Sequence, residues 1–186
     1  MNDKKLVIGI VGMPGSGKSD VGKILKRKGF VVMEFGDIIR DIMKRDNIPI
    51  NNKSIREFSI KFKREHGDDI LAKEITKKII SMNRKKFALV GIRSKVEIDY
   101  LRKHLKNFIL VAVMAPKEIR FKRIVKRGRE DDFKSKRDFE YREKMEEKLG
   151  VTKAIKLADI YLFNTSTRAD LERSVKVLLE YAKNKT

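Results

Sequence analysis

The sequence contains no cysteine, which excludes disulfides, thiolate metal sites and cysteine nucleophiles. Long hydrophobic runs are missing as well, since residues 108–115, among the longest, are far too few to span a bilayer. Residues 1–5 lead into a glycine-rich turn instead of the hydrophobic region of a signal peptide. These absences predict a cytoplasmic protein without a membrane partner.

Acidic residues are outnumbered, with 26 Asp and Glu against 46 Lys and Arg, so the 186-residue chain has a formal net charge of +20. This charge favours anionic partners, nucleotides first and nucleic acid as a further candidate. A thermostable surface rich in Lys, Arg and Glu explains the same excess. We favour this second explanation because the positive charges are spread along the chain. The length predicts one domain, residues 1–186, with a sizeable core.

Five short apolar runs rich in β-branched residues predict β-strands, and they alternate with stretches of helical periodicity. Such alternation is typical of an α/β fold with helices on both faces of a parallel sheet. Ser54 with Glu57, and Ser94 with Glu97, have the spacing of capping boxes and predict two helix starts. The fold class is therefore α/β, with three layers around a five-stranded parallel sheet. The predicted strands are residues 6–11, 30–35, 87–90, 108–115 and 160–163.

The insertion between the second and third predicted strands is wholly helical and too long for a plain crossover. It predicts an accessory lobe over one edge of the site, at about residues 37–82. Gly150 is placed to stop a helix that ends at Leu149. His66 and His104 fall in polar helix ends without metal-ligand spacing, so both are expected at the surface.

One motif carries chemistry, because residues 12–19 fit the pattern G-x-x-x-x-G-K-[ST] in full between a predicted strand and a predicted helix. Its glycines let backbone N–H groups point into a concavity that holds phosphates, and the helix adds the positive end of its dipole. Lys18 would reach the β- and γ-phosphates of ATP, and the Ser19 hydroxyl would ligate Mg²⁺. The motif consists of Gly12, Met13, Pro14, Gly15, Ser16, Gly17, Lys18 and Ser19.

Three further segments resemble adenylate kinases and occur in that family's order. Residues 36–40 are similar to its Gly-Asp-x-x-Arg segment, which implies that Arg40 grips the phosphate of an acceptor monophosphate. Residues 91–93 are similar to its Gly-Phe-Pro-Arg segment, which implies the same for Arg93. Residues 123–127 resemble the entry to the lid, which implies that Arg123 stacks on the donor adenine and that Arg127 contacts phosphate.

Over nearly the whole chain the sequence resembles an uncharacterised archaeal family of adenylate-kinase-related proteins, which is also similar to dephospho-coenzyme A kinases. Members share the G-M-P-G-S-G-K-S loop, the G-D-x-x-R segment, G-I-R-S and a G-R-E-D-D lid sequence. The resemblance implies a P-loop core, an acceptor-binding lobe at about 37–82 and a lid at about 127–137. It specifies fold and nucleotide binding better than it specifies substrate.

The arginines also have a physical rationale, since a planar guanidinium holds a phosphate bidentately and keeps its charge. Arg40 and Arg93 lie beside predicted strand ends, where α/β sheets bind their ligands. For Arg123 and Arg129, function and a solvated helix end are equally supported. For Arg142, a position on the exposed helix surface is the favoured interpretation.

The sequence departs from the kinase pattern at Val90, where the third strand commonly ends in a carboxylate that holds Mg²⁺ through water. Asp37 is the nearest substitute and Glu34 a weaker one. The pair Asp131 and Asp132 is another candidate metal contact, although an exposed lid loop is favoured for it. The missing carboxylate is expected to affect the rate of phosphoryl transfer more than nucleotide binding, because the backbone of the loop and Lys18 hold the phosphates.

Together these features predict an ATP- and Mg²⁺-dependent phosphotransferase with an AMP-like acceptor, in which Lys18, Arg93, Arg127 and Asp37 act in catalysis. Asp37, Arg40 and Arg93 would bind the acceptor. A dephospho-coenzyme A-type kinase is the alternative enzyme, and a hydroxyl acceptor would need a base such as Asp37. A nucleotide-gated RNA-binding protein with little turnover is the alternative from another class.

Overall fold

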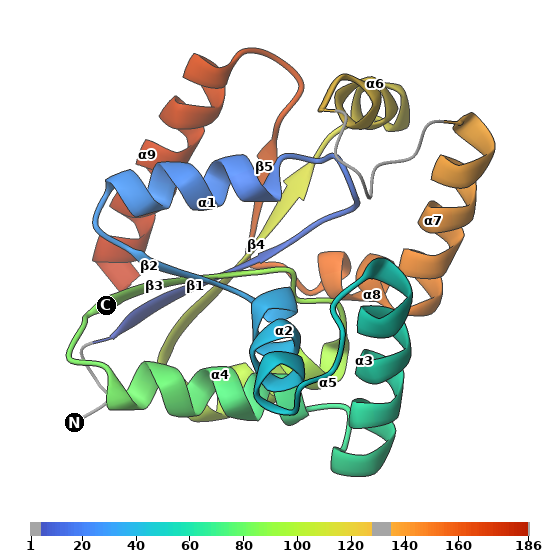
Figure 1. Ribbon diagram of the computed structural model, residues 1–186. Helices are drawn as coiled ribbons and strands as arrows, with labels where there is room; N and C mark the ends of the chain where they lie inside the picture. The colour runs from blue at the N-terminus through green and yellow to red at the C-terminus, as the bar shows by residue number, and fades with distance from the viewer. Residues whose placement is uncertain (1–4, 128–134, 186) are drawn as a thin grey trace.

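A five-stranded parallel sheet forms the centre of the computed structural model, which describes residues 5–127 and 135–185 (Figure 1). The strand order is β2-β3-β1-β4-β5, and every neighbouring pair is parallel. The α/β class and the five predicted strands are thus confirmed. The strands are β1 (Leu6–Val11), β2 (Val31–Glu34), β3 (Lys86–Val90), β4 (Asn107–Met114) and β5 (Ile160–Phe163).

Helices cover both faces of the sheet, as a parallel sheet with two apolar faces requires. One face packs against α1 (Lys18–Arg27) and α9 (Arg168–Lys185). The other face packs mainly against α4 (Ile70–Ser81), α5 (Lys95–His104) and α8 (Val151–Lys156). Leu171, Val175, Leu178 and Ala182 of α9 are buried against the sheet, and Leu179 is partly buried. The three layers are confirmed.

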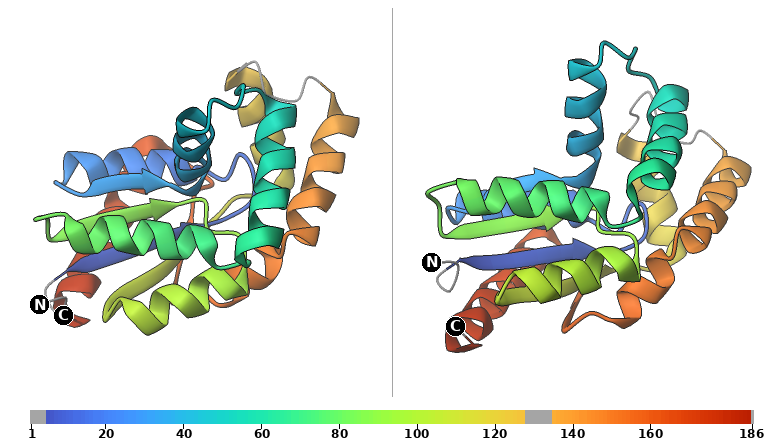
Figure 2. Two further views of the ribbon diagram at one scale, coloured as in Figure 1. Left: turned by 60° about the horizontal axis from the view of Figure 1, so that its bottom comes forward. Right: turned by 90° about the horizontal axis from the view of Figure 1, so that it is seen from below.

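Four helices gather at the carboxyl ends of the strands (Figure 2). They are α2 (Phe35–Arg45), α3 (Asn52–His66), α6 (Lys117–Arg127) and α7 (Lys136–Lys148). Because all five strands run in the same direction, the loops that follow them open at this one edge. The arrangement brings together side chains that lie far apart in the sequence.

The second strand ends earlier than predicted, because Phe35 is the first residue of α2 and is buried against the core. The predicted capping box of Ser54 and Glu57 is wrong. The Asn51 side chain accepts a hydrogen bond from the Ser54 N–H at 2.9 Å, and Ser54 Oγ accepts one from the Asn51 N–H at 3.0 Å. Asn51 is therefore the residue before the helix, and the reciprocal box closes three positions earlier than the sequence spacing suggested.

The capping box of Ser94 and Glu97 is confirmed, with both reciprocal hydrogen bonds present. Gly150 ends α7 with a φ of 92°, as predicted, because few residues other than glycine adopt this conformation. The short helix α8, which begins directly after Gly150, was not predicted. Its six residues are too few for a periodic pattern to be recognised, although Val151 and Ala154 are buried.

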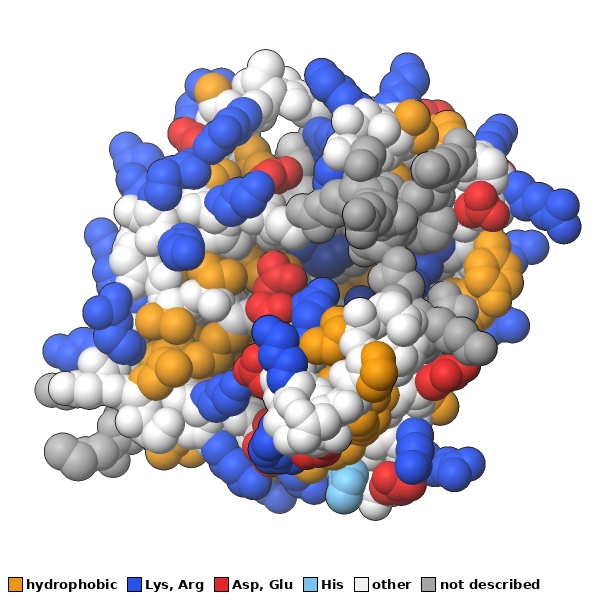
Figure 3. All heavy atoms as spheres, viewed as in Figure 1, with side chains coloured by type: hydrophobic (Ala, Val, Ile, Leu, Met, Phe, Trp, Pro, Cys, Tyr) orange, Lys and Arg blue, Asp and Glu red, His pale blue; other side chains and the backbone are white. Residues whose placement is uncertain are grey.

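Lysine and arginine side chains are spread over the whole visible face of the molecule, which agrees with their spread along the chain (Figure 3). Both histidines, His66 and His104, are exposed as predicted. Within residues 5–127 and 135–185, no helix is both long and apolar enough to cross a membrane.

Candidate functional site

The glycine-rich loop between β1 and α1 needs its glycines for two physical reasons. Gly15 and Gly17 have φ angles of 76° and 102°, in the left-handed region that side chains disfavour. A Cβ atom at Gly15 would lie 2.6 Å from the Arg120 carbonyl oxygen. At Gly17 it would lie 2.1 Å from Asn164 Nδ2. The loop is therefore held in its curved form by close contacts with segments that follow β4 and β5.

Lys18 lies in this loop with its ammonium group turned toward the backbone. Its Nζ donates hydrogen bonds to the carbonyl oxygens of Gly12 at 2.7 Å and Met13 at 3.1 Å. The side chain is only partly exposed, and burial is the main reason that the pKa of Lys18 falls to about 8.

Charged groups from distant parts of the chain act on this ammonium group. The Glu146 carboxylate of α7 raises the pKa of Lys18, whereas the guanidinium groups of Arg93, Arg120 and Arg127 lower it. The structure thus brings Arg93 and Arg127, two of the predicted site residues, into the electrostatic surroundings of Lys18.

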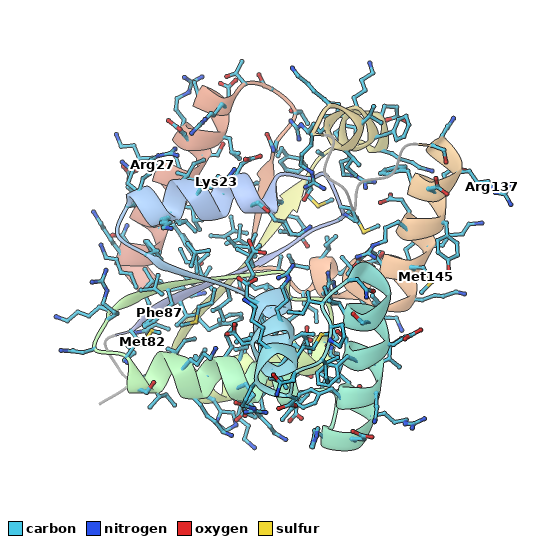
Figure 4. All side chains as sticks on the ribbon, viewed as in Figure 1. Lys23, Arg27, Met82, Phe87, Arg137 and Met145 are labelled. Carbon is cyan, nitrogen blue, oxygen red and sulfur yellow. The ribbon has the colours of Figure 1, made fainter. Side chains whose placement is uncertain are left out.

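A cavity of about 500 Å³ opens between the glycine-rich loop and α6. Lys18 and Ser19 lie on one side of it, and Arg123 and Arg127 lie on the other. Lys23 of α1 also borders the cavity (Figure 4). In the space-filling view, lysine and arginine side chains line a hollow near the middle of this face (Figure 3). The cavity is therefore suited to a polyanionic ligand.

Asn164, directly after β5, connects this cavity to the loop and was not predicted. Its Nδ2 donates to the Ser16 carbonyl oxygen at 2.8 Å, and its Oδ1 accepts from Arg123 Nη2 at 3.3 Å. Among the described residues, Arg123 Nη1 and Ser16 Oγ are buried without a hydrogen-bond partner. Unsatisfied buried donors are costly, so a bound ligand would be a natural partner for them.

Arg120 of α6 and Glu143 of α7 form a buried pair that was also not predicted. Arg120 donates from Nη1 and Nη2 to the two carboxylate oxygens of Glu143 at 2.5 and 2.6 Å. Its Nε donates to the Ala115 carbonyl oxygen at 3.0 Å, and Nη1 also donates to that of Pro14 at 3.2 Å. This pair braces α6, α7 and the glycine-rich loop against one another.

Glu146, one turn further along α7, holds two arginines. Its Oε2 lies 3.2 Å from Arg93 Nε, and its Oε1 lies 2.7 Å from Arg142 Nη2. Arg142, predicted on the exposed helix surface, is half-buried beside this partner on its own helix, with 32% of its side chain exposed. The opposite side of α7 carries Arg137, which points away from the molecule (Figure 4).

Arg40 and Asp37 pair with each other on α2, with Arg40 Nη1 and Asp37 Oδ1 2.6 Å apart. Both side chains are more than 40% exposed. Within the described residues, neither has a hydrogen bond or ion pair with the glycine-rich loop or with Arg93. The structure thus joins Arg93 to Arg142 through a carboxylate, and it does not join Arg93 to Arg40.

Val90 is buried at the end of β3, with its Cγ2 against Gly22 of α1. Its partner in the sheet register is Glu34, at the end of the neighbouring strand β2. In the described part of the chain, no group of three or more His, Asp or Glu side chains is arranged to hold a metal ion. Arg129, Asp131 and Asp132 lie outside the described residues, as does most of the predicted lid.

The strand order, the loop after β1 and the cation-lined cavity define a P-loop protein with a kinase-like fold. Residues 8–147 match the family model described as an AAA domain. A relative from Pyrococcus horikoshii, UPF0200 protein PH1008, is 33% identical over 175 residues, covering 92% of this chain and 94% of its own. UPF0200 protein TV0279 from Thermoplasma volcanium is 34% identical over 173 residues, covering 92% and 96%. The chain therefore belongs to the UPF0200 family of archaeal proteins. This confirms the resemblance to an archaeal family.

Solved structures share the fold. TT1252 from Thermus thermophilus has a TM-score of 0.64 at 20% identity, covering 95% of this chain and 97% of its own. Shikimate kinase from Acinetobacter baumannii, in complex with shikimate, has a TM-score of 0.66 at 17% identity, covering 97% and 95%. At such low identity the likeness concerns the arrangement of strands and helices.

Proposed function

We propose that this protein transfers a phosphoryl group from ATP, bound with Mg²⁺, to an acceptor that carries a phosphate, with an AMP-like nucleoside monophosphate as the preferred candidate. One observation carries the proposal. The P-loop lysine that would hold the donor phosphates shares its surroundings with Arg93, an arginine that follows the neighbouring strand β3. A site built only to bind ATP would not need this second source of positive charge.

The donor would be held by the glycine-rich loop, residues 12–19. Lys18 would neutralise the β- and γ-phosphates, and Arg123 Nη1, buried and without a partner among the described residues, fits a nucleotide in the adjoining cavity. Ser19 lines the same cavity and would supply its hydroxyl to Mg²⁺. Bound Mg²⁺ supplies charge neutralisation at the phosphate oxygens. Arg127 would neutralise the transferring group.

The acceptor phosphate would be bound by Arg93, with Arg40 on the neighbouring helix α2. Asp37 already accepts a hydrogen bond from Arg40, so its carboxylate is held at the same end of the sheet. This placement also supports the alternative acceptor, a hydroxyl group as in a dephospho-coenzyme A-type kinase, for which Asp37 would act as the base. Shikimate kinase and a gluconokinase from Sinorhizobium meliloti share the fold, so the fold does not select a nucleotide acceptor.

The decisive experiment incubates the purified protein with Mg²⁺ and ATP, together with AMP or dephospho-coenzyme A, and separates the products by chromatography. The expected result with AMP is two ADP formed for each ATP consumed, and with dephospho-coenzyme A one ADP together with one coenzyme A, each in excess of an acceptor-free control. Lys18→Ala should abolish it. If neither acceptor is phosphorylated and RNA binds in an ATP-dependent way, the protein is a nucleotide-gated binding protein instead of a kinase.

A further inference from the structure

Two buried glutamates of α7, Glu143 and Glu146, lie among arginines close to the P-loop. They lie one helical turn apart, and only 8% and 4% of their surfaces are exposed. A buried carboxylate is costly unless it is paired, and it also repels the phosphates that the P-loop would bind. Their presence therefore calls for a physical explanation.

Glu143 is explained by the packing of the protein. Both of its carboxylate oxygens accept from Arg120, and the same guanidinium also donates to the carbonyl oxygens of Ala115 and Pro14. Arg120 is itself buried. This arginine is committed to the brace between α6, α7 and the P-loop, so it has little capacity left for a ligand.

Glu146 differs because it pairs with two arginines from separate segments. It contacts only one nitrogen of each guanidinium group. It contacts Arg93 through Nε and Arg142 through Nη2. The two arginine side chains remain 42% and 32% exposed, whereas the Glu146 side chain is only 5% exposed. The carboxylate thus lies beneath the two guanidinium groups, and each keeps further N–H donors.

We infer that Glu146 is a positioning residue, which holds Arg93 and Arg142 side by side so that their remaining donors bind the phosphate of the acceptor together. The inference rests on the proposed function, because it assigns a role to Glu146 at the acceptor side of that site. Two guanidinium groups so close together would repel each other without the shared carboxylate. A phosphate can accept from both, since a guanidinium offers its donors in a flat, fixed fork.

The direction in which one substitution changes the affinity for an anion distinguishes a positioning role from a purely electrostatic one. Glu146→Gln removes a negative charge near the site and nearly preserves the shape of the side chain. Electrostatics alone predicts that an anion then binds more tightly. If Glu146 orients the two arginines, the anion binds more weakly, because the guanidinium groups separate and their donors turn away.

Calorimetric titration with AMP, and separately with inorganic phosphate, tests this role. Glu146→Gln should raise the Kd for AMP about tenfold, near the low end of the effect of losing a hydrogen bond to a charged group. Glu147→Gln is the matched control, since Glu147 is the next residue, is exposed and undergoes the same change of charge. It should leave the Kd for AMP unchanged. ATP affinity and the melting temperature of each variant report on the donor side and on folding.

Arg142→Ala provides a second route should Glu146→Gln fold poorly. It should weaken AMP binding similarly, and the double variant should be little weaker than either single variant, because both changes disrupt one unit. Equal or tighter AMP binding by Glu146→Gln, fully additive effects, or a wild-type protein that binds neither AMP nor phosphate would overturn the inference. If AMP binds as described but no phosphoryl transfer occurs, the proposed function fails and the role of Glu146 stands.

Discussion

The charge of Lys18 sets a pH dependence of ATP binding whose size follows from its surroundings. Burial lowers the pKa of this lysine from 10.5 to about 8. Above pH 8 the unliganded protein therefore loses the positive charge that would bind the β- and γ-phosphates. If only the protonated form binds ATP well, the Kd rises as the protonated fraction falls, to about ten times its neutral value at pH 9.

Stability should change in the opposite direction with pH. The pKa of Lys18 in the folded protein lies below its unfolded value, so the unfolded chain binds more protons between pH 8 and pH 10.5. The contribution of this group to the free energy of unfolding therefore rises with pH across that window. The same ammonium group that favours ATP binding thus destabilises the unliganded fold while it is charged.

Calorimetry with Mg²⁺ and ATP at pH 7, 8 and 9 measures the effect. Lys18→Ala should keep the fold, bind ATP weakly at all three values and lose the pH dependence. Lys26→Ala, an exposed lysine on the same helix, is the control and should behave like the wild type. A wild-type Kd that stays constant from pH 7 to 9, or an equal decline in Lys18→Ala, would refute the role given to this lysine.

Three further predictions concern the surrounding side chains. Arg93→Ala and Arg40→Ala should each weaken AMP binding by about 1.5–3 kcal/mol in calorimetry, and unchanged affinity in both would place the acceptor elsewhere. Glu143→Gln should lower the free energy of unfolding by about 3–5 kcal/mol in urea denaturation, because it leaves the buried charge of Arg120 uncompensated. Val90→Asp should raise kcat by adding a carboxylate beside α1, at some cost in stability. Unchanged kcat would indicate that Glu34, its neighbour across the strands, already serves the metal.

The parts of the fold that could be predicted are those with a local signal. The strands are recognised as continuous apolar runs. The P-loop is recognised by the fixed spacing of its glycines, and at Gly15 and Gly17 the structure has no room for a side chain. The capping box at Ser94 is likewise a spacing of three residues within one turn. At Asn51 the same signal was present, but Ser54 could serve either as the cap or as its partner. The hydrogen bonds select the second role.

The buried charges of the site could not be predicted, because each depends on a partner far away in the sequence. Asn164 lies 148 positions from Ser16, and Arg120 lies 106 positions from Pro14. In a chain with 39% charged residues, the sequence does not distinguish a Glu or Arg of the site from one on the surface. Only the rotation of α7 about its axis decides that Glu146 faces inward, and that rotation is determined by packing instead of local sequence.

This dependence on packing has a consequence for how the site is maintained. The Arg120–Glu143 pair connects α7 to the Pro14 carbonyl of the P-loop, and Glu146 lies one turn away on the same rigid helix. A shift of α7 therefore moves the Glu146 carboxylate relative to Lys18, whose pKa it raises, and relative to Arg93, which it holds. Loss of the Glu143 brace should consequently affect both sides of the site, raising the Kd for ATP as well as that for AMP. Glu146→Gln leaves that brace intact, so besides its effect on AMP it should weaken ATP binding only through a lower pKa of Lys18. A Glu143→Gln variant that is destabilised but binds both ligands normally would show that the two carboxylates act independently.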